Sequence, residues 1–104
     1  MPILERKQPR VSPLYQDLSL FKGRLPRALL TCGTQDPLLD DSVFMTAKWQ
    51  MAGGDATLRI YNGGVHGFMA FPKEMLSLAG DALGDTAAFL AVCMENVEAQ
   101  KGKL

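Results

Sequence analysis

Asp36 and His66 are the two side chains in this sequence whose types and spacing best fit a chemical role. Asp36 lies in residues 33–38 (GTQDPL) and His66 in residues 63–68 (GGVHGF), each directly after a run of residues typical of a β-strand. An imidazole exchanges a proton near neutral pH, and a carboxylate on one ring nitrogen fixes its tautomer and stabilises its charged form. The pair therefore predicts a general base, which would act on a nucleophile.

A structural role for the same two residues is the alternative. Asp36 would then cap a turn before a helix, and His66 would make one polar contact from a loop, as isolated Asp and His residues usually do. The neighbouring Asp40 and Asp41 could add carboxylates, but one His with these three Asp residues forms no recognised ligand spacing. We therefore predict no metal site.

The elements that would position the pair follow the order strand, helix, strand, helix. Residues 28–32 form a short apolar run, typical of a strand buried on both faces of a parallel sheet. A helix is predicted from residues 40–42 to the glycines at 53 and 54. Residues 56–61 alternate as a second strand does, and apolar residues recur at helical spacing over residues 75–97. The sequence thus predicts an α/β fold with parallel strands.

The two loops should lie side by side in such a fold. Asp36 and His66 are 30 residues apart, which is the length of one helix-plus-strand unit. In open parallel sheets the functional groups collect in the loops after the carboxyl ends of the strands. If the two strands are neighbours, the carboxylate and the imidazole meet at one edge of the sheet.

The nucleophile for this base has no clear candidate in the chain. The G-x-S-x-G turn that exposes a serine hydroxyl after a strand does not occur, and neither does a glycine-rich phosphate loop. The glycines at 63 and 64 precede the histidine, which is the reverse of the HGGG type of oxyanion loop. The serines, all outside such a turn, are Ser12, Ser19, Ser42 and Ser77.

The chain resembles the C-terminal part of an α/β-hydrolase of the hormone-sensitive-lipase-like carboxylesterase family, the α/β-hydrolase fold-3 type. The resemblance covers residues 11–98. The residues that carry it are Ser12-Pro13-Leu14, Leu25-Pro26 before the apolar strand, Gly33, Asp36-Pro37-Leu38, Asp40, Gly53 near the end of the helix, and His66-Gly67-Phe68 before the last helix.

The resemblance implies that Asp36 is the acid and His66 the base of a catalytic triad. It also implies hydrolysis of a small carboxylic ester through an acyl-serine, without a cofactor. The serine turn, the oxyanion loop and the preceding strands would lie upstream of Met1, so the isolated chain is expected to be inactive. Phe68, Met69 and Phe71 could line a substrate pocket or belong to the core. A non-catalytic remnant or interaction module with half of the fold is the alternative function.

The expected organisation is an irregular, extended N-terminal segment (residues 1–26), a C-terminal α/β-hydrolase subdomain (residues 27–99) and a tail (residues 100–104). Two strands leave sheet edges unpaired, so we expect the isolated chain to self-associate, or to pair with the missing N-terminal part of the fold.

The composition narrows the choice of partners. The 104 residues include 11 Lys or Arg and 11 Asp or Glu, so no net charge favours nucleic acid. There is no uninterrupted apolar run of about 18 residues that predicts a membrane span.

The N-terminus lacks the apolar region of a secretory signal, which indicates a cytoplasmic location. Cys32 and Cys93 have no disulfide or metal spacing and are expected to be reduced thiols.

Overall fold

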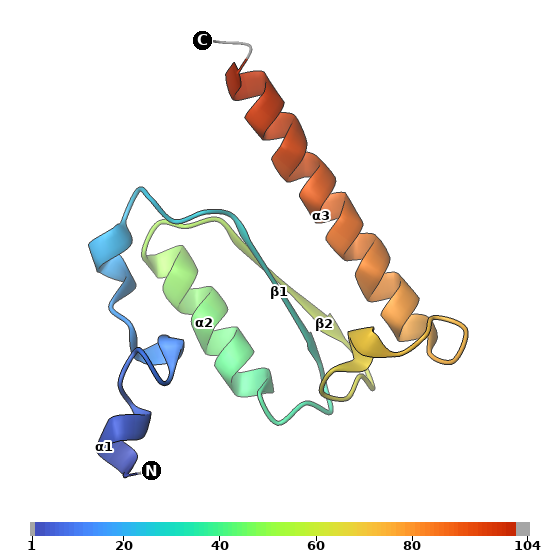
Figure 1. Cartoon of the computed structure of the whole chain (residues 1–104), viewed down its shortest axis with the longest axis horizontal. Coiled ribbons are helices and arrows are strands. Elements are labelled where there is room, and N and C mark those ends of the chain that lie inside the picture. The colour runs from blue at the N-terminus through green and yellow to red at the C-terminus, as the bar shows by residue number, and fades with distance from the viewer. Residues whose placement is uncertain (1, 102–104) are drawn as a thin grey trace. The chain divides into compact units, whose positions relative to one another are not determined.

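The structure is a computed structural model that describes residues 2–101, with side chains described up to residue 99 (Figure 1). After three short N-terminal helices, its elements follow the predicted order of strand, helix, strand and helix. In chain order they are α1 (Ile3–Arg6), the 3-10 helices η1 (Pro13–Tyr15) and η2 (Leu18–Phe21), β1 (Ala28–Gly33), α2 (Leu39–Met51), β2 (Ala56–Tyr61), the 3-10 helix η3 (Phe68–Ala70) and α3 (Ser77–Lys101).

The two strands form a parallel sheet with α2 as the crossover. β1 and β2 are hydrogen-bonded neighbours. The Ala28 N–H donates to the Asp55 carbonyl at 2.9 Å, and the Thr34 N–H donates to the Tyr61 carbonyl at 3.1 Å. Both bonds join residues 27 positions apart, which is the pattern of parallel strands in one register. The α/β class with parallel strands is therefore confirmed.

The packing of β1 differs from the prediction. Only Cys32 and Gly33 are buried, and Ala28 to Thr31 are half-buried. A strand becomes buried on both faces when other layers cover the two faces of its sheet. In the described chain β1 has one neighbouring strand, β2, so the prediction of burial on both faces is wrong for this chain.

Two compact units divide the described residues. One comprises residues 2–30 and 40–58, and the other comprises residues 31–39 and 59–101. The loop that carries Asp36 and the loop that carries His66 both belong to the second unit, although α2 lies between them in the sequence.

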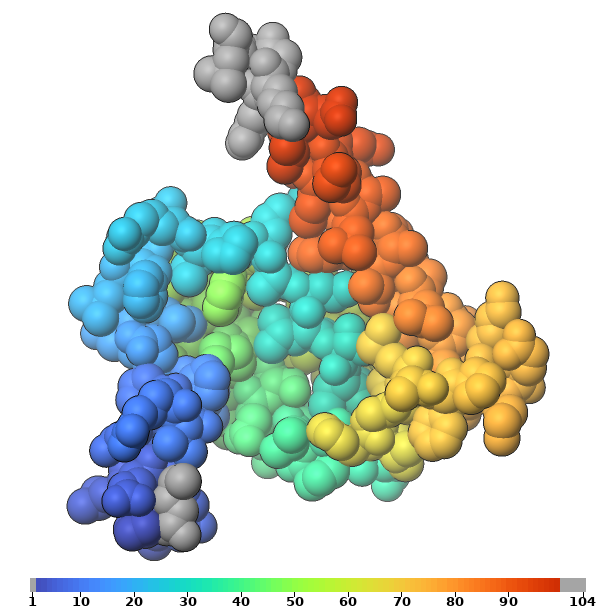
Figure 2. Space-filling view, viewed as in Figure 1, coloured from blue at the N-terminus to red at the C-terminus, as the bar shows by residue number. Residues whose placement is uncertain are grey.

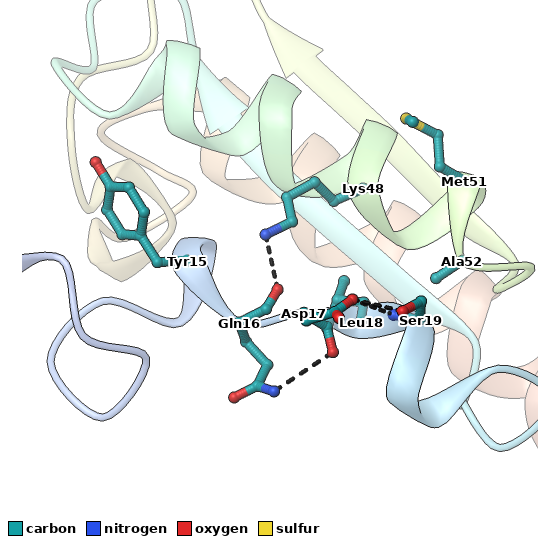
Figure 3. A pocket seen from close by; sticks show the side chains of 8 residues that line it. All are labelled: Tyr15, Gln16, Asp17, Leu18, Ser19, Lys48, Met51 and Ala52. Carbon is teal, nitrogen blue, oxygen red and sulfur yellow. Dashed lines mark hydrogen bonds between the residues drawn. The ribbon is translucent and has the colours of Figure 1, made fainter.

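In the first unit, Lys48 on α2 holds the N-terminal segment. Its ammonium group donates to the Leu14 carbonyl oxygen. It also donates to the Gln16 carbonyl oxygen at 2.8 Å (Figure 3). The Trp49 indole N–H also donates to the Pro26 carbonyl, at 2.9 Å. The segment is thus tied down by α2 and contains three single-turn helices, where the sequence led us to expect an extended chain.

Replacing Lys48 with methionine should release this segment, because the thioether keeps the apolar stem but donates no hydrogen bond. Two charge-assisted bonds would be lost, so we expect cleavage by chymotrypsin after Tyr15 to accelerate about tenfold. The matched control is Lys22→Met, which removes a charge from an exposed position of the same unit. Equal cleavage rates in the two variants would contradict the anchoring role.

The second unit is built around η3 and the start of α3. These two helices pack against each other, with Phe68 only 3% exposed and Ala79 and Ala82 fully buried. α3 begins at Ser77 and continues through Gly80 and Gly84 without interruption. It ends at Lys101, so residues 100 and 101 of the predicted tail are helical. Residues 102–104 of that predicted tail lie outside the described residues.

The C-terminal half of α3 exposes large apolar side chains along the segment coloured orange to red in Figure 2. They are Leu90, Val92, Met94 and Val97. Within the described residues, Ser77–Ala99 is also long and apolar enough to cross a membrane by length and composition, although only 11% of the tested stretch is buried. A single helix of this kind is weak support for a membrane span.

Candidate active site

The Asp36 loop begins where β1 ends and leads directly into α2. One carboxylate oxygen of Asp36, Oδ1, accepts the Leu38 N–H at 2.8 Å, and the Asp36 carbonyl accepts the Leu39 N–H at 3.1 Å. Asp36 therefore caps the turn before the helix, as the structural alternative proposed. That role uses Oδ1 only, so it leaves the second oxygen available for another partner.

The second oxygen of Asp36 faces His66. The distance from Asp36 Oδ2 to His66 Nδ1 is 3.0 Å, a hydrogen-bond distance. The carboxylate side chain is 10% exposed and the imidazole 67% exposed. A ring held by a nearly buried carboxylate on Nδ1, with most of its surface accessible, has the geometry of an oriented base. The two predicted residues are thus brought together.

The surroundings of Asp36 favour its ionised form. The backbone N–H of Leu38 lowers the pKa of the Asp36 carboxyl, and His66 lowers it further, while partial burial opposes both. A carboxyl with a lowered folded-state pKa stabilises the fold above its unfolded pKa of about 3.9, and this stabilisation is lost as pH falls through the folded value. The carboxylate is therefore charged at neutral pH.

Glycines shape the His66 loop after β2. Gly63 and Gly67 have φ angles of +85° and +74°, which side chains other than glycine rarely adopt. Gly64 lies against Gly33, the last residue of β1 before the Asp36 loop, and a Cβ placed on Gly33 would be 2.0 Å from the Gly64 carbonyl oxygen. The two loops therefore approach each other backbone to backbone.

A small cavity of about 170 Å³ opens beside the imidazole. It is lined by Thr31, Cys32, Asp36, His66, Gly67, Phe68 and Met69. Phe68 is both buried and part of this lining, while Phe71 lines a separate cavity of about 290 Å³ next to Val65. Phe68 is thus a core residue that also lines the cavity beside His66, whereas a contact with substrate stays a prediction.

Tyr61 supports the His66 loop from the end of β2, and sequence patterns did not identify it. Its ring packs on Phe68 with centroids 5.3 Å apart, and its hydroxyl donates to Asp85 Oδ2 on α3 at 2.5 Å. Burial, followed by the Asp85 carboxylate, raises the pKa of Tyr61 to about 12. Asp85 lies 24 residues after Tyr61 in the sequence, so no local sequence pattern indicates that these two residues form a hydrogen bond.

The Asp85→Asn variant should lower the pKa of Tyr61 to a value between about 10 and about 12, because burial remains but the carboxylate is lost. The pKa of Tyr61 is measured from the ultraviolet absorbance of tyrosinate. The measurement uses a Tyr15→Phe background, which removes the other tyrosine of the chain. Since the folded-state pKa is raised, the stability that depends on the neutral phenol should be present below pH about 10 and lost as pH rises to about 12. If Tyr61 titrated at the same pH in Asp85→Asn as in the wild type, the Asp85 carboxylate would not contribute to its raised pKa.

Residues 2–101 contain no cluster of three His, Cys, Asp or Glu side chains that could hold a metal ion. No serine lines the cavity beside His66. Cys32 and Cys93 are free cysteines, the first buried and the second half-buried.

Comparison with known proteins relates the chain to hydrolases. A family described as having the alpha/beta hydrolase fold matches residues 2–70. Human hormone-sensitive lipase is 36% identical over 63 residues, which is 61% of this chain and 6% of the lipase. An esterase from Acinetobacter venetianus is 36% identical over 81 residues, which is 78% of this chain and 25% of the esterase.

A solved structure of similar architecture is the hyperthermophilic esterase from the archaeon Pyrobaculum calidifontis. It has a TM-score of 0.73 and 31% sequence identity, and the match covers 84% of this chain and 27% of that protein. The chain therefore spans about a quarter of the esterases it matches and a smaller share of the human lipase.

Proposed function

Because this chain belongs to the α/β-hydrolase fold family, in its hormone-sensitive-lipase-like branch of esterases and lipases, we propose that Asp36 and His66 are the acid and the base of a serine carboxylesterase. The observation that supports these roles is the 3.0 Å contact between Asp36 Oδ2 and His66 Nδ1, with the other carboxylate oxygen held by a backbone N–H. The carboxylate thereby orients the ring and stabilises the imidazolium that forms during the reaction.

The proposed reaction uses a serine and an oxyanion loop from outside these 104 residues. The support is that none of the four serines lies in a G-x-S-x-G turn and that the chain spans about a quarter of its esterase relatives. His66 would take the serine proton through Nε2 as the oxygen attacks the ester carbonyl. It would then give that proton to the leaving alcohol and activate a water that hydrolyses the acyl-serine.

The proposed substrate is a small, uncharged ester with a short or medium acyl chain. The 170 Å³ cavity beside the imidazole supports this choice, because its lining combines Phe68 and Met69 with the polar pair. The chemistry itself requires no cofactor, since the proton transfers and the covalent intermediate use protein side chains alone.

A chimera tests the proposal. Residues 2–101 replace the matching part of the Acinetobacter venetianus esterase, which supplies the remaining fold. We expect this chimera to hydrolyse a p-nitrophenyl ester, and the purified 104-residue chain to show no hydrolysis above background. Hydrolysis by the chain alone, with loss on His66→Ala, would place the nucleophile within these residues and overturn the proposal.

An interaction module without chemistry is the second candidate function. It is favoured by the exposed apolar side chains of α3, among them Leu90 and Met94, and by a sheet of only two strands in the described chain. This role predicts self-association, which sedimentation velocity over a range of concentrations measures. A chimera that folds but does not hydrolyse esters would favour it over the esterase.

A further inference from the structure

We infer that Thr34 is a positioning residue whose hydroxyl joins the acid loop to the base loop and thereby sets the Asp36–His66 contact. The inference rests on the proposed function, because it assigns Thr34 a task toward the proposed acid and base. Within the described residues, the Thr34 hydroxyl is hydrogen-bonded to neither Asp36 nor His66, so Thr34 would act through the backbone of the two loops.

The Thr34 hydroxyl bonds twice to the loop that carries His66. Its oxygen accepts the Gly63 N–H at 2.8 Å, and its proton points to Asn62 Oδ1 at a longer 3.4 Å. Thr34 itself lies two residues before Asp36, and Gly63 lies three residues before His66. One half-buried side chain thus bridges the two loops close to both members of the pair.

The Thr34 hydroxyl holds the turn at Gly63, because it accepts the backbone N–H of that residue. Gly63 has a φ of +85° at the start of the loop, and its N–H points away from its own strand into the acid loop. The neighbouring backbone bonds run between the same two loops, from the Thr34 N–H to the Tyr61 carbonyl and from the Gln35 N–H to the Gly64 carbonyl. Among the described residues, the Gly63 N–H donates to the Thr34 hydroxyl and to no backbone carbonyl.

The measurement uses the fact that His66 is the only histidine in the chain. Its ring ¹⁵N resonances are therefore unambiguous and report which nitrogen carries the proton. In a neutral imidazole, a carboxylate on Nδ1 keeps the proton on that nitrogen, so the spectra are recorded at alkaline pH. We expect Thr34→Val to reduce the ratio of paired to unpaired imidazole about fivefold, the effect of losing one ordinary hydrogen bond.

Three further variants make the result specific. Thr34→Ser keeps the hydroxyl and should restore the wild-type ¹⁵N shifts. Thr86→Val removes a hydroxyl of the same kind, which donates to the Ala82 carbonyl within α3, and should leave the His66 shifts unchanged. Asp36→Asn removes the carboxylate and defines the shifts of a ring that has no carboxylate on Nδ1.

Each pattern of results decides the matter. Shifts in Thr34→Val that move toward those of Asp36→Asn, with rescue in Thr34→Ser, support the inference. Wild-type shifts in Thr34→Val, together with a clear change in Asp36→Asn, would refute the role of Thr34 and leave the proposed acid–base pair intact. Identical shifts in the wild type and Asp36→Asn would show that the pair itself does not form, which overturns both proposals for this chain.

Discussion

Replacing His66 with alanine in the esterase chimera is expected to lower kcat by about 10⁵- to 10⁶-fold. Without the imidazole, nothing in the site takes the proton from the serine or returns it to the leaving alcohol, so both chemical steps fail together. KM should change little, because the ring contributes to the transition state more than to substrate binding. Steady-state hydrolysis of a p-nitrophenyl ester measures both constants.

The Asp36→Asn variant separates orientation from proton transfer. Its amide can keep the turn before α2 but cannot stabilise the imidazolium, so we expect a loss of about 10⁴-fold in kcat. Asp41→Asn, an exposed change in the first turn of α2, is the matched control and should stay within about twofold. If Asp36→Asn were as active as this control, Asp36 would not be the triad acid.

Replacing Gly33 with alanine is expected to destabilise the second unit by about 3 kcal/mol or more. The added Cβ would lie 2.0 Å from the Gly64 carbonyl oxygen and 2.3 Å from its carbon, and both are backbone atoms that no rotamer change can move away. The two loops would have to separate, which would also break the contact between Asp36 and His66. Urea unfolding measures the loss of stability, and the chimera measures the loss of activity.

Gly84→Ala provides the control for this glycine. A Cβ at Gly84 meets no atom within 4 Å, and the residue lies inside α3. Alanine favours a helix over glycine, so we expect this variant to gain up to about 1 kcal/mol. A Gly33→Ala chain as stable as Gly84→Ala would show that the loops do not approach as closely as described.

The regular elements could be predicted because their signals are local. The alternation in residues 56–61 predicted β2 with its observed bounds, and the apolar run at residues 28–32 predicted β1 to within one residue. Placing Asp36 and His66 together needed only the rule that loops after neighbouring parallel strands meet at one edge. The structure bears out this proximity, whereas the catalytic roles of the two residues stay a prediction.

Features that depend on contacts distant in sequence could not be predicted. The Lys48 ammonium bonds to carbonyls 32 and 34 residues earlier, and it holds single-turn helices in a segment whose prolines suggested an extended chain. The Thr34 hydroxyl and the Tyr61–Asp85 bond likewise join residues 24 to 29 positions apart. Such contacts depend on how β1 and β2 pair and on where α3 packs. The periodicity of the sequence specifies neither the pairing nor the packing.

The parallel pairing of β1 and β2 also constrains how this site can evolve. Its hydrogen bonds keep a constant offset of 27 residues, from Ala28 and Asp55 to Thr34 and Tyr61. A slip by one residue would shift one strand by about 3.3 Å and turn its side chains to the other face. That shift exceeds the 3.0 Å between Asp36 and His66. An insertion or deletion should therefore be tolerated in the turn at Gly53 and Gly54, which precedes β2. The same change within β2 should be removed by selection, because it would separate Asp36 from His66.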